Sequence, residues 1–291
     1  LDNYYVVQQA LRQVKRDLPA SYYKELPKLD DGSSWHGLPR VFALARHFTI
    51  QENCYTDVHR FARFLQAYQQ ETPLKMGEVW ALPIMLRFCL LECLAQTAVR
   101  VTRQTEASEQ VAPMLQFSVT AADTDVIANA ITGLRQLASY DWNTFFEESS
   151  PVEQILRQDP AGLYGRMTFH TRDQYRKVVE KLALATGQSE LSVARAAIDL
   201  TQPAVTMPPA PDVDPWAGLV QPVAAHVGHY LLGDARDRLA AAIGHQPNPL
   251  RRWLQNHVTA VYTGSLIGLT VLLLVVLVLY TGWLGGAWWQ M

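Results

Sequence analysis

Apolar residues recur at three- and four-residue steps along most of the 291-residue chain. This spacing predicts amphipathic α-helices. Four stripes carry it: Tyr4, Val7, Leu11, Val14 and Leu18; Val58, Phe61, Phe64, Leu65 and Tyr68; Val126, Ile127, Ala130, Ile131, Leu134 and Leu137; and Tyr175, Val178, Val179 and Leu182. No run alternates convincingly between apolar and polar residues, so strands are expected to be scarce. The pattern predicts an all-α, multi-helix fold.

Local signals predict where several helices begin and end. Predicted starts are Thr72 before Pro73, the capping box Ser150-Pro151-Val152-Glu153, a second capping box from Thr171 to Gln174, and Ser189. A side-chain oxygen at such a position accepts from a free backbone N–H, and proline fits the first helical position. Gly187 is expected to close the helix before Ser189, because glycine adopts the left-handed conformation easily.

The last forty residues differ from the rest of the chain in composition. After Arg252 the sequence contains no Asp, Glu, Lys or Arg. An apolar run this long exceeds the roughly 20 residues that cross a bilayer, and only a helix crosses alone with its backbone satisfied. We predict a transmembrane helix over residues 257–285, with a buried core helix as the alternative. Arg251 and Arg252 flank one end and Trp283 the other, so the positive-inside rule places residues 1–250 in the cytoplasm.

Residues 79–99 form a competing apolar segment that contains Arg87 and Glu92. Each charge at mid-bilayer costs about 2.5–3.5 kcal/mol. We therefore interpret this segment as the central buried helix of a soluble domain, with its charges paired or at its edge.

Five prolines interrupt residues 202–216 and forbid a regular helix there. The predicted organisation is a helical soluble domain over 1–201, a Pro-rich linker over 202–216, juxtamembrane helices over 217–256, and the transmembrane helix.

The charge balance and the cysteines limit the kinds of partner and compartment that we expect for the chain. The chain has 25 basic and 27 acidic side chains, a balance that argues against a nucleic-acid partner. Its cysteines, Cys54, Cys89 and Cys93, suggest no disulfide framework. Cys89 and Cys93 share a helix face, where small core residues are favoured over metal or redox chemistry. This usage fits a reducing compartment.

Three groups of polar residues are candidates for chemistry. Asp123-Thr124-Asp125 could hold a divalent cation on a nucleotide-sugar diphosphate, but acidic residues are also expected in a first helical turn. His226 and His229 could bind a transition metal or be ordinary core or surface histidines.

The carboxylates of Glu147-Glu148, and of Glu25 with Asp30-Asp31, could act as acid and base or be solvated loop charges. For each of these groups we favour the structural alternative over a role in catalysis or metal binding. The sequence contains no glycine-rich phosphate loop and no G-x-S-x-G motif. No catalytic, cofactor-binding or metal residue is predicted.

Several strings occur in an order that resembles the N-terminal region of cyclic β-1,2-glucan synthases. They are residues 25–29 (ELPKL), 37–41 (GLPRV), 77–82 (GEVWAL), 159–162 (DPAG) with Tyr164, Met167 with Phe169, 171–173 (TRD) with Tyr175-Arg176, and 226–228 (HVG) with Tyr230-Leu231. The resemblance covers about residues 20–250 and continues into the apolar helix. The Pro-rich linker and the stretch around 104–122 do not match.

The resemblance implies a place in a very large bacterial inner-membrane enzyme that polymerises and cyclises glucose from UDP-glucose. The glycosyltransferase domain follows this region, so UDP-glucose and a divalent cation would bind there, and Asp123 and Asp125 are not carried over as catalytic. The chain is then expected to be a fragment, a non-catalytic cytoplasmic scaffold whose partners are the lipid bilayer and the downstream transferase domain.

Trp80, Tyr164, Arg40 and Tyr230 are candidate anchors, either for an interface or for the domain's own core. Two other functions stay open. One is a self-contained, membrane-tethered adaptor that recruits partners. The other is a small helical glycosidase, which needs two carboxylates about 5–9.5 Å apart across a cleft.

Overall fold

A computed structural model describes residues 2–30, 32, 35–102, 121–203, 223–245 and 257–285. Within these residues the fold is helical, with one isolated antiparallel bridge between Lys28 and Pro39 and no strand, which confirms the all-α prediction. The chain divides into two compact units, residues 1–239 and 240–291. This division falls later than the composition break at 202–216, of which residues 204–216 lie outside the described part.

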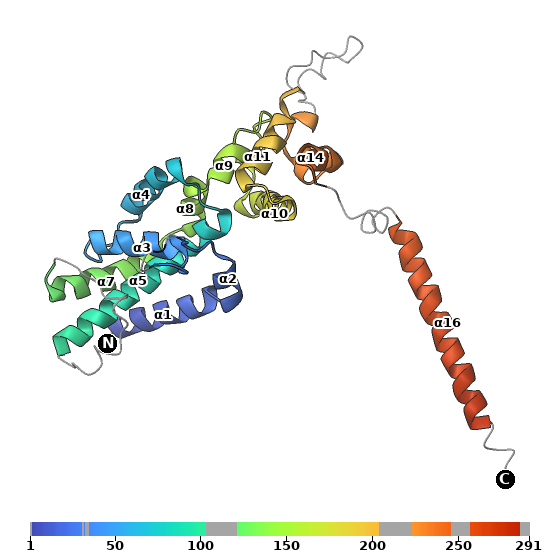
Figure 1. Cartoon of the computed structure of the whole chain (residues 1–291), viewed down its shortest axis with the longest axis horizontal. Coiled ribbons are helices and arrows are strands. Elements are labelled where there is room, and N and C mark those ends of the chain that lie inside the picture. The colour runs from blue at the N-terminus through green and yellow to red at the C-terminus, as the bar shows by residue number, and fades with distance from the viewer. Residues whose placement is uncertain are drawn as a thin grey trace. The chain divides into compact units, whose positions relative to one another are not determined.

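The first unit holds most of the helices (Figure 1). They are α1 (Asp2–Asp17), α2 (Ala20–Glu25), α3 (Arg40–Gln51), α4 (Val58–Glu71), α5 (Met76–Thr102), α7 (Asp123–Ser139), α8 (Trp142–Ser149), α9 (Pro151–Leu156), α10 (Phe169–Thr186), α11 (Glu190–Asp199) and α13 (Gly228–Leu231), with the 3₁₀ turns η2 (Tyr164–Arg166) and η4 (Val223–Ala225). The short helix α14 (Arg236–Ala242) contains the boundary between the two units.

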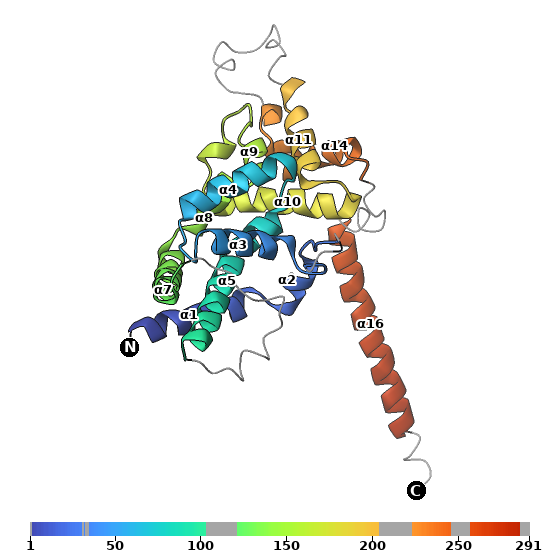
Figure 2. The same ribbon diagram turned by 60° about the vertical axis from the view of Figure 1, so that its left-hand side comes forward.

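Helix α5 is the centre of this unit, and α1, α3, α7 and α8 pack against it (Figure 2). It is apolar enough to be a membrane span by composition, yet 61% of its most apolar window is buried inside the protein. Glu92 forms an ion pair with Arg46 at 2.5 Å, and Arg87 donates a hydrogen bond to the Leu137 carbonyl at 2.8 Å. The interpretation of residues 79–99 as a core helix with paired charges agrees with this packing.

Most predicted helix ends are where the sequence placed them. Ser150 accepts from the Glu153 N–H with Pro151 at the first helical position, and Ser189 accepts from the Ser192 N–H. Gly187 closes α10 with a φ of 71°. These contacts confirm three predicted helix ends. The capping box at Ser150 is only half formed, because the Glu153 carboxylate binds arginines and the Ser150 N–H donates to the Phe146 carbonyl.

Two predicted starts are wrong. Thr168, not Thr171, caps α10, because the helix begins one turn earlier than the capping-box pattern suggests. Thr72 ends α4 instead of starting α5, which begins at Met76. There the Glu78 carboxylate accepts from the Lys75 N–H at 2.9 Å, so Glu78 supplies the contact expected of a cap.

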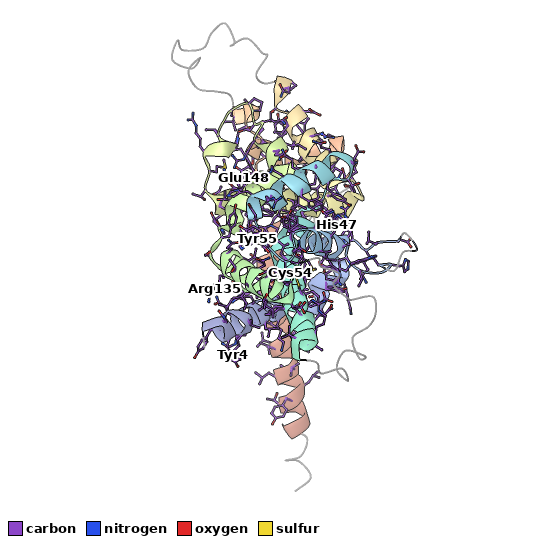
Figure 3. The ribbon with its side chains drawn as sticks, turned by 90° about the vertical axis from the view of Figure 1, so that its left-hand side faces the viewer. Tyr4, His47, Cys54, Tyr55, Arg135 and Glu148 are labelled. Carbon is purple, nitrogen blue, oxygen red and sulfur yellow. A yellow bond between two sulfur atoms is a disulfide. The ribbon has the colours of Figure 1, made fainter. Side chains whose placement is uncertain are left out.

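The apolar stripe predicted for α1 is also only partly buried. Tyr4 and Leu11 are 63% and 46% exposed, whereas Ala10 is 4% exposed. The helix contacts α5 and α7 and is tied to α7 by Arg135, which donates to Asn3 at 2.8 Å near the labelled Tyr4 in Figure 3. The small Ala10 fits this contact, and part of the bulky stripe remains at the surface.

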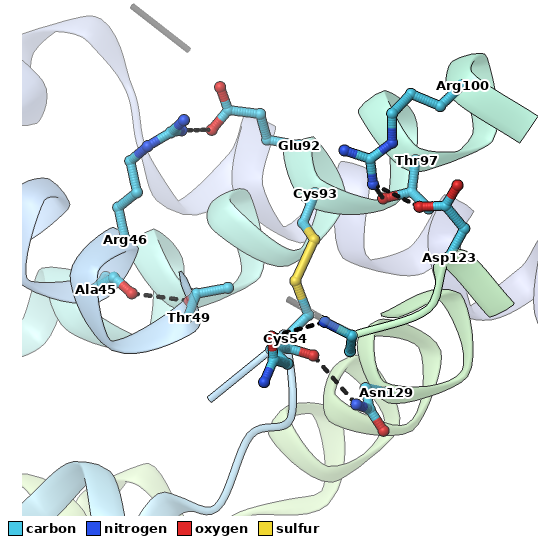
Figure 4. Close-up of a disulfide and its surroundings, with 12 residues drawn as sticks. Ala45, Arg46, Thr49, Cys54, Glu92, Cys93, Thr97, Arg100, Asp123 and Asn129 are labelled. Atoms are coloured by element: carbon cyan, nitrogen blue, oxygen red, sulfur yellow. Dashed lines mark hydrogen bonds and ion pairs between the residues drawn. A yellow bond between two sulfur atoms is a disulfide. The ribbon is translucent and has the colours of Figure 1, made fainter. Parts of the chain in front are cut away.

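The expectation for the cysteines needs correction. Cys54 and Cys93, 39 residues apart in the sequence, form a disulfide (Figure 4). Cys89 is free and buried. Cys54 follows α3 in a turn where Asn53 and Cys54 have φ values of 49° and 60°. The Asn53 carbonyl accepts from Asn129 of α7 at 3.1 Å, which holds the turn from its other side. Sequence spacing misses this pairing because only the tertiary fold brings the turn to α5, and the argument for a reducing compartment no longer holds.

The second unit contains α16 (Val258–Gly285), which confirms the predicted apolar helix. Residues Tyr262–Gly282 have a mean hydropathy of 2.4, and none of that window is buried inside the protein. A helix of this length and composition is a candidate membrane span. The flanking residues Arg251 and Arg252, and the side chain of Trp283, lie outside the described residues.

Candidate functional site

Glu153 forms ion pairs with three arginines, more than any other carboxylate among the described residues, and its side chain is fully buried at the start of α9. Its oxygens accept from Arg157 Nε at 3.0 Å, Arg176 Nη1 at 2.8 Å and the Tyr164 hydroxyl at 2.7 Å. A buried charge is tolerated only when it is paired and hydrogen-bonded in this way. Burial, together with the neighbouring Glu153, raises the pKa of Tyr164 well above its usual range, so its hydroxyl remains a donor.

Glu147 extends the same network and corrects a prediction. It was expected to be a solvated loop charge, but it lies in α8 with 14% of its side chain exposed. It pairs with Arg157 at 2.9 Å and also with Arg172. We call Glu147, Glu153, Tyr164, Arg157, Arg172 and Arg176 the Glu153 cluster. Its two carboxylates already bind guanidinium groups, so they are unsuited to take up protons from a substrate.

Arg176 connects this cluster to a group of aromatic rings. Its guanidinium lies 5.0 Å from the Phe146 ring centre and 4.6 Å from that of Phe169. The side chain is 2% exposed, and its Nε and Nη2 atoms have no hydrogen-bond partner among the described residues. Attraction between the cation and the two ring faces accounts for this position.

The rings form one wall of a pocket of about 530 Å³. Trp80 stacks on Phe146 with ring centres 4.4 Å apart, and Phe169 meets Trp80 edge-on at 6.0 Å. We call this the aromatic pocket; it is lined from α1, α2, α5, α8 and α10 by Asp17, Tyr22, Met76, Gly77, Trp80, Ile84, Phe146, Phe169, Asp173, Arg176, Lys177 and Glu180. Its size falls within the range typical of small-molecule sites.

The charged groups that line the aromatic pocket are three carboxylates and two cations. Asp173 pairs with Lys177 at 2.7 Å and with Arg176 at 3.6 Å, whereas Glu180 has no ion pair among the described residues. Burial, followed by the charges of Glu180 and Glu78, raises the pKa of Tyr22, whose hydroxyl donates to the Gly77 carbonyl at 2.5 Å. The pocket therefore offers more hydrogen-bond acceptors than cations.

A second polar network joins residues on either side of the undescribed segment 204–222. Asp159 accepts from the Val227 N–H at 2.9 Å and from His226 Nδ1 at 2.8 Å. His226 Nε2 in turn lies 3.2 Å from the Tyr175 hydroxyl. Burial acts to raise the pKa of Asp159, but hydrogen bonds from His226 and from backbone N–H groups outweigh it and leave the pKa below its usual value.

This network gives His226 protein partners, and the described residues contain no group of three or more histidine, cysteine or acidic side chains suited to a metal. Asp123 forms an ion pair with Arg100 at 2.7 Å in the first turn of α7. That position agrees with the helix-start interpretation of the D-x-D triplet.

The four predicted anchors have different environments. Tyr164 is fully buried and Tyr230 is 3% exposed, so both belong to the core. Arg40 forms a two-point ion pair with Glu78 at 2.5 and 2.6 Å. Trp80 is partly exposed and lines a pocket with other aromatic rings.

Sequence reasoning missed the Glu153 cluster and the role of Phe146. One signal was present, because Arg172 and Arg176 are four residues apart on the face of α10 that also carries Tyr175 and Val179. Charged residues in register with a buried apolar stripe indicate that their partners come from another helix.

The strings that carry the resemblance meet in these contacts. Arg40 joins residues 37–41 to 77–82 through Glu78, and Trp80 meets Phe169. Asp159 joins residues 159–164 to 226–231 through His226. Segments far apart in the chain thus meet at the Arg40–Glu78 pair, in the aromatic pocket and in the Asp159 network.

No protein-family profile matches the chain. Among curated proteins, the chain is 27% identical over 315 aligned residues to the cyclic beta-(1,2)-glucan synthase NdvB of Rhizobium meliloti (strain 1021). The match covers 85% of this chain but only 11% of that protein, so the chain spans about a tenth of its relative. The resemblance predicted from the short strings is confirmed: the chain is similar to a segment of a cyclic β-1,2-glucan synthase.

Proposed function

We propose that this chain is a non-catalytic, membrane-tethered scaffold segment of a longer synthase that makes cyclic β-1,2-glucan from UDP-glucose. The observation that carries the proposal is the similarity to the glucan synthase over 85% of the chain. The saturated carboxylates of the Glu153 cluster support the non-catalytic part, because their oxygens bind arginines of the same domain.

On this proposal residues 1–250 lie on the cytoplasmic side of a bacterial inner membrane, and α16 spans the bilayer. The helical domain packs on a glycosyltransferase domain of the same polypeptide, which binds UDP-glucose and a divalent cation. The support for this orientation is the pair Arg251 and Arg252 before α16 and the lack of charged residues after it.

The test uses the native polypeptide in membranes of its own organism. An antibody against this chain should detect a polypeptide several times heavier than the 32.7 kDa of the chain itself. The same membranes should incorporate labelled glucose from UDP-glucose into cyclic β-1,2-glucan. A native polypeptide of about the chain's own mass would overturn the proposal.

The non-catalytic role has its own test in that polypeptide. Replacing Asp123 and Asp125 by asparagine should leave glucose incorporation unchanged, because both lie at the first turn of α7. Loss of incorporation at an unchanged protein level would contradict the proposed role.

A second candidate, a self-contained adaptor, is favoured by one observation. Tyr4, Tyr5 and Leu11 on α1 are 63%, 65% and 46% exposed, and exposed apolar side chains can mark a partner's surface. Copurification from native membranes separates the candidates. A stable partner encoded by another gene favours the adaptor, and one continuous long chain favours the synthase segment.

A further inference from the structure

We infer that the aromatic pocket binds a neutral oligosaccharide, namely a stretch of β-1,2-linked glucan, against the partly exposed rings of Trp80 and Phe169. The identity of the sugar rests on the proposed function. The preference for a neutral, hydroxyl-rich ligand rests on the pocket itself.

The aromatic wall is the first argument. A pyranose ring presents faces of C–H groups, and the negative face of an aromatic ring attracts such groups. Trp80 and Phe169 both line the pocket and are both partly exposed. The pocket thus combines ring surface with access from solvent.

The second argument is that this wall is held in place before any ligand arrives. Phe146 supports Trp80 from behind, and Arg176 is clamped between Phe146 and Phe169. Arg176 is itself held by the buried Glu153 at 2.8 Å. A preorganised wall loses little side-chain entropy on binding, which favours a weakly interacting neutral ligand.

The polar groups supply the third argument. Sugar hydroxyls donate well to carboxylates, and Asp173 and Glu180 line the pocket beside the rings. Glu180 has no ion pair among the described residues, so its oxygens are available as acceptors. Lys177 provides a donor beside Asp173.

The same charges disfavour binding of UDP-glucose, the glucose donor of the proposed reaction. The pocket is lined by the carboxylates of Asp17, Asp173 and Glu180. Among the residues described there, Lys177 is the only cation that is not held by a buried carboxylate. A diphosphate would meet like charges, which is unfavourable. The pocket therefore fits the glucan product and not the UDP-glucose donor, and it acts as a holding site away from the reacting atoms.

Binding is tested by calorimetric titration of the whole 291-residue chain in detergent micelles. The probes are linear β-1,2-linked glucooligosaccharides, with maltooligosaccharides, UDP-glucose and choline as comparisons. We expect saturable binding of the β-1,2-linked series and weaker or no binding of the others. Preferential binding of UDP-glucose or choline, or no binding of the β-1,2-linked series, overturns the inference.

Variants locate the site. Phe169→Leu removes the ring and should weaken binding about tenfold. Glu180→Gln keeps the shape but removes the charge, and should weaken binding about fivefold without disturbing the core. The control is Gln70→Ala in a separate polar pocket, which should bind as the unaltered chain does. Equal affinity of Glu180→Gln, Phe169→Leu and the unaltered chain would overturn the assignment.

The two proposals fail in different ways. A long native polypeptide that makes glucan, together with a chain that binds none, leaves the proposed function intact and removes the pocket's role. A chain that binds β-1,2-linked glucan but is native as a short polypeptide removes the synthase proposal and keeps the binding site.

Discussion

Two parts of the helical domain join distant segments by different physics. At the crosslinked turn, residues 52–56, a disulfide ties Cys54 to Cys93 of α5. In the Glu153 cluster, ion pairs tie α8, α9 and α10. The first connection is covalent and acts mainly on the unfolded chain, by reducing its entropy. The second exists only in the folded state and depends most on the partners that are buried with Glu153. The domain can therefore lose stability through reduction at one place and through a single unpaired charge at the other.

The largest effect is expected in the Glu153 cluster. Arg176→Ala leaves the fully buried Glu153 short of a cation, so the free energy of unfolding should fall by about 3–5 kcal/mol in urea titrations. Arg157→Ala is the matched control. Its side chain is 44% exposed, so its loss should cost less than about 1 kcal/mol. Equal losses in the two variants would show that the cluster is not a buried ionic centre.

The crosslinked turn should come next. Closing a loop of 39 residues by a disulfide is worth roughly 2–4 kcal/mol. Adding a reductant should lower the free energy of unfolding of the unaltered chain by this amount, and its melting temperature should fall accordingly. The melting temperature of a Cys93→Ala variant should not change with reductant. If reductant leaves the melting temperature unchanged and both thiols react with an alkylating agent, the purified chain has no crosslink between Cys54 and Cys93.

The Asp159 network should show a smaller, pH-dependent effect. Because the pKa of Asp159 is lowered in the folded protein, its stabilisation is present above the unfolded pKa, about 3.9, and is lost as pH falls through the lower folded value. Asp159→Asn should cost about 1–3 kcal/mol at pH 7. It should also flatten the dependence of stability on pH below about 4. If the free energy of unfolding of Asp159→Asn falls with pH below about 4 as steeply as that of the unaltered chain, Asp159 is not the source of this pH dependence.

The smallest effect tests the packing around the crosslinked turn. A Cβ at Gly133 would lie 2.8 Å from Thr56 Oγ1 and 3.0 Å from Leu90 Cδ1. Overpacking costs about 1–3 kcal/mol, and the better helix propensity of alanine offsets about 1 kcal/mol of it. Gly133→Ala should therefore destabilise by about 1 kcal/mol net. Gly165→Ala, with nothing within 4 Å of its Cβ, should change stability by less than about 0.5 kcal/mol.

Periodicity in the sequence predicted the parts that depend on neighbours along the chain. The stripe from Val126 to Leu137 is buried where expected, and Ser150, Gly187 and α16 are in place. Helix repeats and caps are local, so sequence alone can predict them. The direction in which α1 faces depends on the shapes of α5 and α7, and its exposed Tyr4 could not be predicted from spacing.

The candidate site likewise combines features that the local sequence predicts with features that depend on tertiary packing. Trp80 was singled out because it lies in a string that carries the resemblance, but its pocket requires five helices to meet. The disulfide and the Glu153 cluster each join residues far apart in the chain or from different helices. Their partners have no fixed sequence spacing, so a single sequence does not reveal them.

The composition of α5 has a consequence for how this chain is synthesised. Residues Met76–Val101 pass the same length and hydropathy criteria as the C-terminal span. They leave the ribosome before α7, which forms part of their burial site, has been made. At that moment the bilayer competes with the unfinished domain for the segment. Arg87 and Glu92 each add about 2.5–3.5 kcal/mol against insertion. The two charges that are ion-paired or hydrogen-bonded in the finished domain thus also disfavour insertion of its central helix into a bilayer.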